Sequence, residues 1–216
     1  MSLIDLLNKK SILPLESEAL IGREEEVEVP EHHFVKGTPL KGPFPDHLKQ
    51  AIFGMGCFWG VERRFWELDG VYTTSAGYAG GYTKNPSYKE VCTGFTGHNE
   101  VVLVVYDPTI VSYGSLLKTF WEDHDPTQGM RQGNDIGTQY RSCIFLKKEA
   151  HYLKSLSLLK KFQNILTDNN FNKLITTEIK MGIDFYYAED YHQQYLAKNP
   201  QGYCNIKGLG LDLDID

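Results

Sequence analysis

Hydrophobic positions recur at two periods along the chain, and from about residue 48 they predict a series of strands and helices. Apolar runs predict strands over residues 49–53, 71–78, 101–106, 140–146 and 174–179. Apolar positions at helical spacing predict helices over 58–68, 148–166 and, more briefly, 188–196. Another helix is predicted after an N-cap at Ser112, with its buried stripe at Leu116, Leu117, Phe120 and Trp121, and Pro126 closes that segment. The run 101–106 is apolar on both faces, so we expect it to be a central strand.

The first six of these elements follow the order strand, helix, strand, strand, helix, strand, which is the split β-α-β order of ferredoxin-like folds. We therefore predict an α+β fold, a two-layer sandwich with a mainly antiparallel sheet and helices packed on it. Two long, polar, glycine-rich loops, about 79–98 and 125–137, are where we expect a functional site.

Three regions differ in pattern. Residues 1–47 show no sustained periodicity and contain an acidic run and several prolines, which predicts an extended arm with a short helix near Ile4–Leu7, disorder being the alternative. Residues 48–196 form the predicted catalytic domain, and residues 197–216 a glycine-rich C-terminal tail.

Composition narrows the class of protein. The net charge of −6 over 216 residues argues against nonspecific binding to nucleic acid or to an anionic membrane surface. The sequence has no apolar run long enough to cross a membrane and no signal-peptide pattern, so we expect a cytoplasmic protein with reduced thiols. We also expect a monomer, although the sequence does not reveal the oligomeric state. The four cysteines form no C-x-x-C pair and there is no H-E-x-x-H, so neither pattern predicts a metal site.

Cys57 lies where the first predicted strand turns into the first predicted helix, with glycines at 54 and 56 before it. A thiol at a helix N-terminus is near unpaired N–H groups and the positive end of the helix dipole, so we expect it to lose its proton more easily. The hypothesis is a nucleophilic thiolate. The alternative is a buried cysteine that acts as a small hydrophobic residue.

Other side chains could assist such a thiol. Glu100 opens the most apolar strand, and burial would raise its pKa and leave a neutral acid, although a solvated strand-end glutamate is the alternative. Tyr88 and Tyr140 stand at loop ends, where their hydroxyls could donate to a bound oxygen or simply pack against the loops.

The residues next to Cys57 and those in the tail suggest two further roles. Phe58 and Trp59 could hold a small apolar group of a substrate, or belong to the buried face of the helix. Cys204 lies on the tail, where it could reach a distant thiol and form a disulfide, or be incidental. Cys92 and Cys143 lie in or beside apolar segments and are interpreted as structural.

Two alternative functions remain open on these residues. A cysteine hydrolase would need a histidine base beside Cys57, and the spacing does not distinguish His98, His124 and His192 for that role. A binding module without catalysis would use the aromatic loops to hold a peptide.

Several motifs, taken together and in order, resemble the A-type peptide methionine sulfoxide reductases over about residues 51–210. They are Gly56-Cys57-Phe58-Trp59-Gly60, Gly77-Tyr78-Ala79-Gly80-Gly81, Asn85-Pro86-Ser87-Tyr88, Gly97-His98-Asn99-Glu100 and His124-Asp125-Pro126. Further along come Arg131-Gln132-Gly133-Asn134-Asp135, Thr138-Gln139-Tyr140-Arg141-Ser142, Tyr187-Ala188-Glu189-Asp190 and Gly202-Tyr203-Cys204.

The resemblance implies an enzyme that reduces the S epimer of methionine sulfoxide, free or in proteins, without a metal or organic cofactor. It implies Cys57 as nucleophile, Glu100 as acid and Cys204 as resolving cysteine. It further implies Tyr88 and Tyr140 as hydroxyl donors, Phe58 and Trp59 as the wall that holds the substrate methyl group, and Asp135 as a polar residue of the site.

The implied cycle leaves a Cys57–Cys204 disulfide, which a dithiol such as thioredoxin reduces. Many relatives carry a second recycling cysteine in the tail, whereas Asp212 stands at about that place here. We therefore expect the reductant to act directly on the Cys57–Cys204 disulfide.

Overall fold

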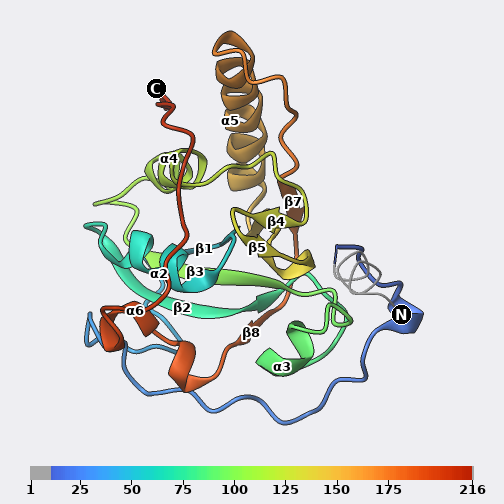
Figure 1. Ribbon diagram of the computed structural model, residues 1–216. Coiled ribbons are helices and arrows are strands. Elements are labelled where there is room, and N and C mark those ends of the chain that lie inside the picture. The colour runs from blue at the N-terminus through green and yellow to red at the C-terminus, as the bar shows by residue number, and fades with distance from the viewer. Residues whose placement is uncertain (1–10, 216) are drawn as a thin grey trace.

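A six-stranded sheet, in the order β7-β6-β1-β3-β2-β8, forms the centre of the computed structural model, which describes residues 11–215 (Figure 1). The strands are β1 (Lys49–Met55), β2 (Val71–Ala79), β3 (Asn99–Tyr106), β6 (Ser142–Leu146), β7 (Glu178–Met181) and β8 (Phe185–Tyr187). Every neighbouring pair is antiparallel except β6 and β7. Strand β3 is buried along its whole length between β1 and β2, as predicted for 101–106.

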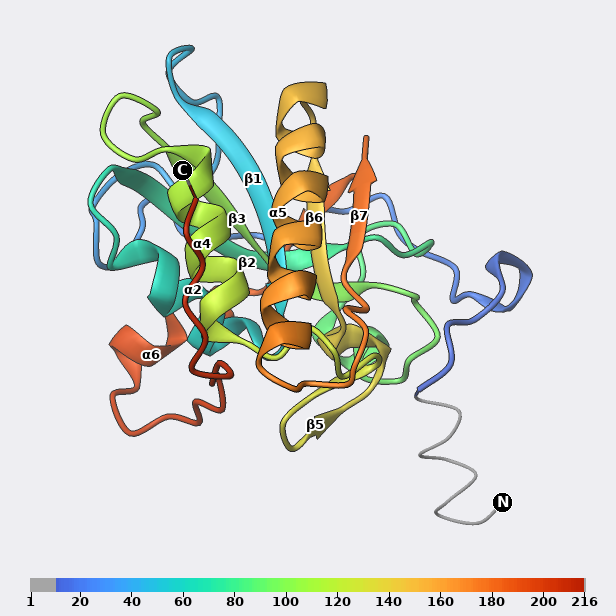
Figure 2. The same cartoon turned by 90° about the horizontal axis from the view of Figure 1, so that it is seen from above.

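The three main helices are α2 (Phe58–Trp66), α4 (Tyr113–Asp123) and α5 (Glu149–Asp168). They pack on one face of the sheet, where α4 and α5 lie side by side when the molecule is seen from above (Figure 2). The main core forms between these helices and the sheet, and includes Phe53, Phe65, Phe120 and Phe162. The α+β class predicted from the sequence is confirmed. No helix among residues 11–215 is both long enough and apolar enough to cross a membrane.

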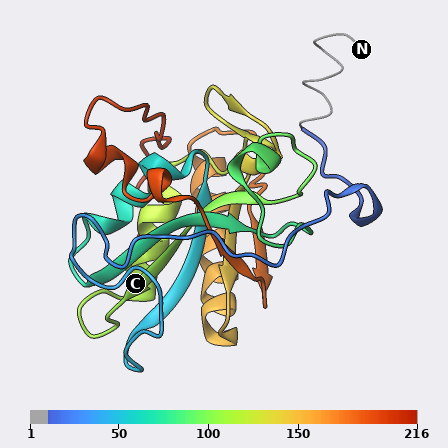
Figure 3. The same cartoon turned by 90° about the horizontal axis from the view of Figure 1, so that it is seen from below.

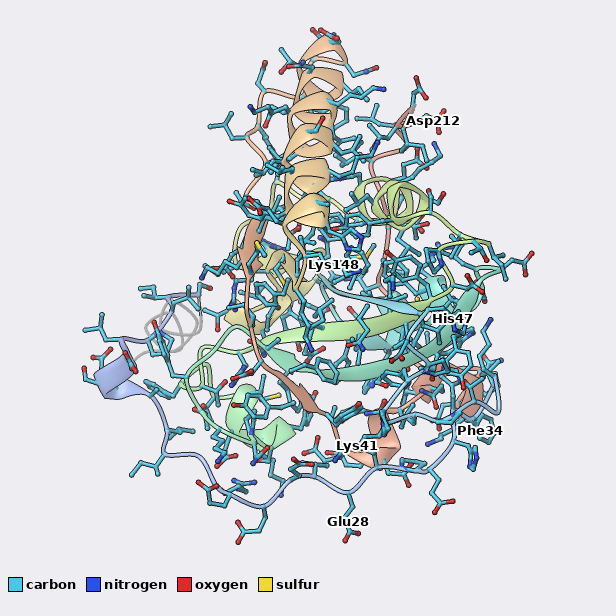
Figure 4. The ribbon with its side chains drawn as sticks, turned by 180° about the vertical axis from the view of Figure 1, so that it is seen from behind. Glu28, Phe34, Lys41, His47, Lys148 and Asp212 are labelled. Carbon is cyan, nitrogen blue, oxygen red and sulfur yellow. The ribbon has the colours of Figure 1, made fainter. Side chains whose placement is uncertain are left out.

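The opposite face of the sheet carries a smaller apolar cluster that includes Leu103, Val105 and Phe145. Phe44 and Phe185 pack against this cluster. The arm that precedes β1 runs beneath the sheet (Figure 3), and Glu28, Phe34 and Lys41 are spaced along it in the view from behind (Figure 4). It contains one short 3-10 turn, η1 (Glu16–Glu18). The predicted helix at Ile4–Leu7 lies outside the described residues.

Two predicted elements differ from those observed. The strand predicted over 174–179 is observed as β7, Glu178–Met181, because Ile175 and Thr176 donate their backbone N–H groups to the side chain of Gln163 and to the Pro126 carbonyl instead of to a sheet neighbour. The predicted helix 188–196 is divided into η3 (Asp190–His192) and α6 (Tyr195–Lys198) by Gln194, whose φ is +48°.

The two long loops, and the residues directly after the second one, contain short elements that the periodicity did not predict. They are α3 (Tyr88–Val91), β4 (Arg131–Gln132), β5 (Asp135–Ile136) and η2 (Thr138–Tyr140). Such elements are too short to produce a hydrophobic period.

The tail leaves α6, passes α2 at Cys204 and then runs along α4. Leu213 is fully buried in the main core, and its backbone N–H donates to the Glu122 carboxylate at 2.5 Å. Asp212 lies on this last stretch (Figure 4). The tail is therefore anchored beyond Cys204, where Leu213 enters the core.

Candidate active site

A glycine turn places Cys57 at the start of α2. Gly56 follows β1 with a backbone φ of +100°, which residues other than glycine rarely adopt. A methyl group on Gly56 would also lie 2.7 Å from Cβ of Gln132. Cys57 is the N-cap residue of α2. The strand, turn and helix predicted around Cys57 are therefore observed.

Glu100 is a buried acid that is hydrogen-bonded to the residue after Cys57. It sits on β3 opposite Tyr78 and is 1% exposed. One carboxylate oxygen accepts the Phe58 backbone N–H at 3.1 Å. Burial raises the pKa of Glu100 to about 8; the Phe58 N–H lowers it in part, and the Asp135 charge raises it. The predicted upward shift of this pKa is confirmed.

The expectation that the Cys57 thiol ionises more easily is wrong for this structure. Burial raises the pKa of Cys57 well above its usual range, and the negative charge of Glu100 raises it further. The backbone N–H of Trp59 counteracts this by hydrogen bonding to the sulfur. The N–H of Phe58, which the helix start would also offer, is instead bound to Glu100.

Tyr88 and Tyr140 face the same centre. Burial raises the pKa of both hydroxyls, and the charges of Glu100 and Cys57 raise both further. For Tyr88 the charge of Cys92, which also hydrogen-bonds its hydroxyl, has a larger effect on the pKa than either. Tyr88 is the first residue of α3, behind an N-cap at Ser87, and its backbone N–H donates to Glu189 at 2.8 Å. The structure thus brings together Cys57, Glu100 and both predicted hydroxyl groups.

The two aromatic residues after Cys57 have different surroundings. Phe58 is buried in the main core, with its ring centroid 4.9 Å from that of His192. Trp59 is partly buried and stacks on Tyr195 at 3.9 Å, while its indole N–H donates to Nδ1 of His192 at 3.0 Å. Trp59 is therefore the more accessible of the two.

The tail brings Cys204 beside α2. Sγ of Cys204 would lie 3.1 Å from a methyl group at Gly60, one turn beyond Cys57, and its charge is among those that raise the pKa of Cys57. Cys204 is exposed and is not bonded to Cys57 in this structure. The adjacent Tyr203 hydroxyl donates to Asp135 at 3.2 Å, so the β4–β5 hairpin and the tail meet at this side of the site.

Comparison with known proteins identifies the family. Residues 49–210 match the family model described as peptide methionine sulfoxide reductase. The chain belongs to this family. It is 58% identical to peptide methionine sulfoxide reductase MsrA 1 of Rhizobium meliloti (strain 1021), over 100% of this chain and 99% of that protein. It is also 58% identical to MsrA 1 of Synechocystis sp., over 98% of this chain and 95% of that protein.

Solved structures agree with this assignment. Methionine sulfoxide reductase A of Corynebacterium diphtheriae superposes with a TM-score of 0.83 at 44% identity, covering 89% of this chain and 93% of that one. Mxr1 from Saccharomyces cerevisiae in reduced form superposes with a TM-score of 0.67 at 36% identity, covering 75% and 91%. The chain is therefore an oxidoreductase of the methionine sulfoxide reductase family, as the motifs predicted.

The sequence reasoning gave two side chains no part in organising this reductase site, since it named Glu189 only within a motif and His192 only as a candidate hydrolase base. Glu189 accepts the Tyr88 backbone N–H and, with its other oxygen, the Tyr78 hydroxyl at 2.9 Å. His192 accepts the Trp59 indole N–H. The motif 187–190 contains Glu189, but nothing in its spacing indicates which partners it binds.

The histidines give the hydrolase alternative no support. His98 bonds the Gly81 N–H and the Thr83 carbonyl. His124 bonds the Phe120 carbonyl and the Ser142 hydroxyl. His192 uses Nδ1 for Trp59, and burial lowers its pKa to about 4, which makes it a weak base.

Proposed function

We propose that this protein reduces methionine-S-sulfoxide, free or in proteins, to methionine by a thiol mechanism in which Cys57 is the nucleophile. The observation that carries the proposal is the buried Glu100 carboxyl, hydrogen-bonded to the residue after Cys57 and with its pKa raised to about 8. A carboxyl group that is neutral at neutral pH can donate a proton, and a sulfoxide becomes electrophilic at sulfur when its oxygen receives one.

In the first step Glu100 donates a proton to the sulfoxide oxygen, with Tyr88 and Tyr140 as hydroxyl donors to the same oxygen. The Cys57 sulfur then attacks the substrate sulfur, and the Cys57 proton passes to the Glu100 carboxylate that the first transfer has left charged. Methionine departs with its sulfur reduced by two electrons, and Cys57 keeps the oxygen as a sulfenic acid. Before this step protonated Glu100 carries no charge, so one of the causes that raise the pKa of Cys57 is absent when the substrate binds.

The substrate side chain needs a site that is apolar for its methyl group and polar at its edge. Trp59 offers a partly buried indole fixed by His192 and Tyr195, and the Phe58 ring contacts the same His192 ring. Asp135, held by Tyr203, supplies a polar group. We assign Phe58 and Trp59 to the methyl group and Asp135 to the polar edge.

Cys204 completes the cycle as the resolving cysteine. Its thiol condenses with the Cys57 sulfenic acid, releasing water and forming a disulfide. A dithiol such as thioredoxin then reduces the disulfide and is itself oxidised. Because Asp212 replaces a second tail cysteine and Leu213 beside it is buried in the core, the reductant attacks the Cys57–Cys204 disulfide directly. The scheme uses thiols and protons alone, so we propose no metal or organic cofactor.

The proposal also includes the type of fold, the division of the chain and the cellular compartment. The strand order β6-β1-β3-β2, with both crossovers made by helices on one face, supports a ferredoxin-like split β-α-β unit for 48–196, flanked by the arm 1–47 and the tail 197–216. We propose that the protein is a monomer and that it is cytoplasmic. The reducing conditions of the cytoplasm would keep the thiols of Cys57 and Cys204 reduced between turnovers.

Trapping the intermediate tests the proposed function. Cys204→Ser enzyme is mixed with a methionine-S-sulfoxide peptide and then with a dimedone-type probe, and the modified residue is located by mass spectrometry. We expect the probe on Cys57 with one methionine formed per enzyme. A Cys57 that stays unmodified while methionine forms would refute the mechanism, and an acyl-enzyme on Cys57 with an ester or amide substrate would favour the hydrolase.

A further inference from the structure

The N-terminal arm lies outside the family match at 49–210, yet it is bonded to both segments that hold Tyr88. The arm passes beneath the sheet from the loop between β2 and β3 to the segment before α6 (Figure 3). At the end near Arg23 the arm bonds mainly to backbone groups. At the end near His33 it bonds to a buried polar network. Together they relate the arm to the active site.

At the first end the arm is paired with the loop that leads to α3. The Arg23 backbone N–H donates to the Lys84 carbonyl at 3.0 Å. Asn85 donates its side-chain amide to the carbonyls of Arg23 and Glu24, both at 3.0 Å, and has φ +46°. The loop conformation just before Ser87 and Tyr88 is therefore fixed by arm backbone.

The Arg23 side chain continues this connection to Tyr88. It donates to one carboxylate oxygen of Glu90 at 2.6 Å. The other oxygen of Glu90 accepts the backbone N–H and the hydroxyl of Ser87, both at 2.8 Å, which completes a capping box at the start of α3. A helix of four residues has little stability of its own, so the direction of Tyr88 depends on this cap.

At the second end the arm enters a buried polar network. Nδ1 of His33 accepts backbone N–H groups, so Nε2 carries the proton and donates to the Thr74 hydroxyl at 2.8 Å. Thr74 donates to Glu62 at 3.0 Å, and Glu62 also accepts from the backbone and side-chain amides of Gln194. The backbone N–H of Phe34 donates to the same Gln194 side chain at 3.0 Å.

Gln194 lies in the segment that holds Tyr88 from the opposite side. Five residues before it, Glu189 accepts the Tyr88 backbone N–H at 2.8 Å. The arm therefore fixes the first residue of α3 through its cap and also fixes the segment that binds its backbone.

We propose that the arm is a positioning element for the active site, in which Arg23 acts through Glu90 and Ser87 to aim the Tyr88 hydroxyl at the substrate oxygen. The inference rests on the proposed role of Tyr88 as a hydroxyl donor. Arg23 touches no reacting atom, so its effect is on the geometry of the first step and leaves substrate binding at Phe58 and Trp59 unchanged.

The test measures the rate of sulfoxide reduction in a single turnover at saturating substrate, together with the substrate concentration for half-maximal rate. Arg23→Ala removes only the side-chain contact, since the backbone bonds of Arg23 remain. We expect the maximal rate to fall about tenfold, with the half-saturating concentration within about twofold. Arg23→Lys can still donate to Glu90 and should recover most of the rate. Lys41→Ala, which breaks the arm's ion pair with Glu26 away from α3, is the matched control and should leave the rate within about twofold.

A double-mutant cycle with Tyr88→Phe separates positioning from a general structural role. If Arg23 acts through the Tyr88 hydroxyl, Arg23→Ala has little further effect once that hydroxyl is absent. Equal losses in both backgrounds, or an Arg23→Ala rate equal to wild type, would overturn the inference while the proposed function stands. A wild-type enzyme that oxidises no Cys57 with sulfoxide would overturn the proposed function and the inference with it.

Discussion

The backbone N–H of Phe58 donates to the Glu100 carboxyl at 3.1 Å, so the buried acid is bound to the residue that follows the nucleophile. This bond takes one of the N–H groups that would otherwise stabilise a thiolate at the start of α2. The acid and the thiol are thereby coupled, because a charge on one raises the pKa of the other. A neutral Glu100 favours ionisation of Cys57, and an ionised Glu100 opposes it.

This coupling predicts that Glu100→Gln makes Cys57 ionise at lower pH. The variant removes the negative charge that raises the pKa of Cys57. Burial, which is the larger cause of the raised pKa, remains. The rate of alkylation of Cys57 by iodoacetamide, measured against pH, should therefore rise at lower pH than in the wild type.

Both enzymes in that comparison should also carry Cys204→Ser, because Cys204 is exposed and would be alkylated as well. Tyr140→Phe, which removes a neighbouring hydroxyl but no carboxylate, serves as a further comparison. Identical alkylation profiles with and without Glu100 would show that the two groups are not coupled.

Glu100 should also make stability depend on pH. Its pKa is about 8 in the fold against an ordinary value of 4.5, so the folded state favours the protonated form. That contribution to stability is fully present below about pH 4.5 and is lost as the pH rises through about 8. Relative to Glu100→Gln, the wild type should lose roughly 3–5 kcal/mol of unfolding free energy across this window.

Urea denaturation at pH 5 and pH 9 measures that difference. Glu16→Gln, which changes an exposed carboxylate in the arm, should follow the wild type at both values. A difference between wild type and Glu100→Gln that is the same at pH 5 and pH 9 would contradict a raised pKa for Glu100.

Gly60 predicts a variant that separates the first and second steps. A methyl group at position 60 would lie 3.1 Å from Sγ of Cys204 and 3.0 Å from Ile206, so Gly60→Ala displaces the tail cysteine from α2. Sulfenic acid formation should stay within about twofold of wild type, while disulfide formation slows roughly tenfold.

Loss of free thiols after one turnover reports the disulfide step. Gly114→Ala is a matched control, since Gly114 is also helical and a methyl group there makes ordinary contacts at 3.5 Å or more. Equal rates of disulfide formation in Gly60→Ala and wild type would argue against approach of Cys204 along this face of α2.

Removing Cys204 itself should limit the enzyme to a single turnover. Cys204→Ser retains the acid, the nucleophile and the hydroxyl donors, so we expect about one methionine per enzyme and no cycling with thioredoxin. The measurement is methionine formed with and without thioredoxin and its reductase. Full thioredoxin-driven turnover by Cys204→Ser would exclude the resolving role.

The sequence predicted what depends on local pattern. Phe58, Val61 and Phe65 lie at helical spacing, and the observed helix α2 buries them, starting at Cys57 as the glycines indicated. The apolar run 101–106 became the central strand. The same run left Glu100 either buried or solvated at the strand end, and the structure shows it buried because its strand lies between two neighbours.

What the sequence could not predict depends on contacts between distant segments. Burial is the largest cause of the raised pKa of Cys57, and the charges of Glu100, Asp135 and Cys204 raise it further from a strand, a hairpin and the tail. Short elements such as α3 are stabilised by tertiary partners, here Glu189, rather than by their own periodicity. The position of a helix N-terminus was therefore predictable, and its electrostatic environment was not.

The central claim is that Cys57 reduces methionine sulfoxide with the aid of Glu100. The most direct measurement offers the separate S and R epimers of a methionine sulfoxide peptide to wild type and Cys57→Ser, with thioredoxin as reductant, and follows methionine formation. We predict reduction of the S epimer by wild type alone. Reduction by Cys57→Ser at the wild-type rate, or no reduction of the S epimer by wild type, would contradict the claim.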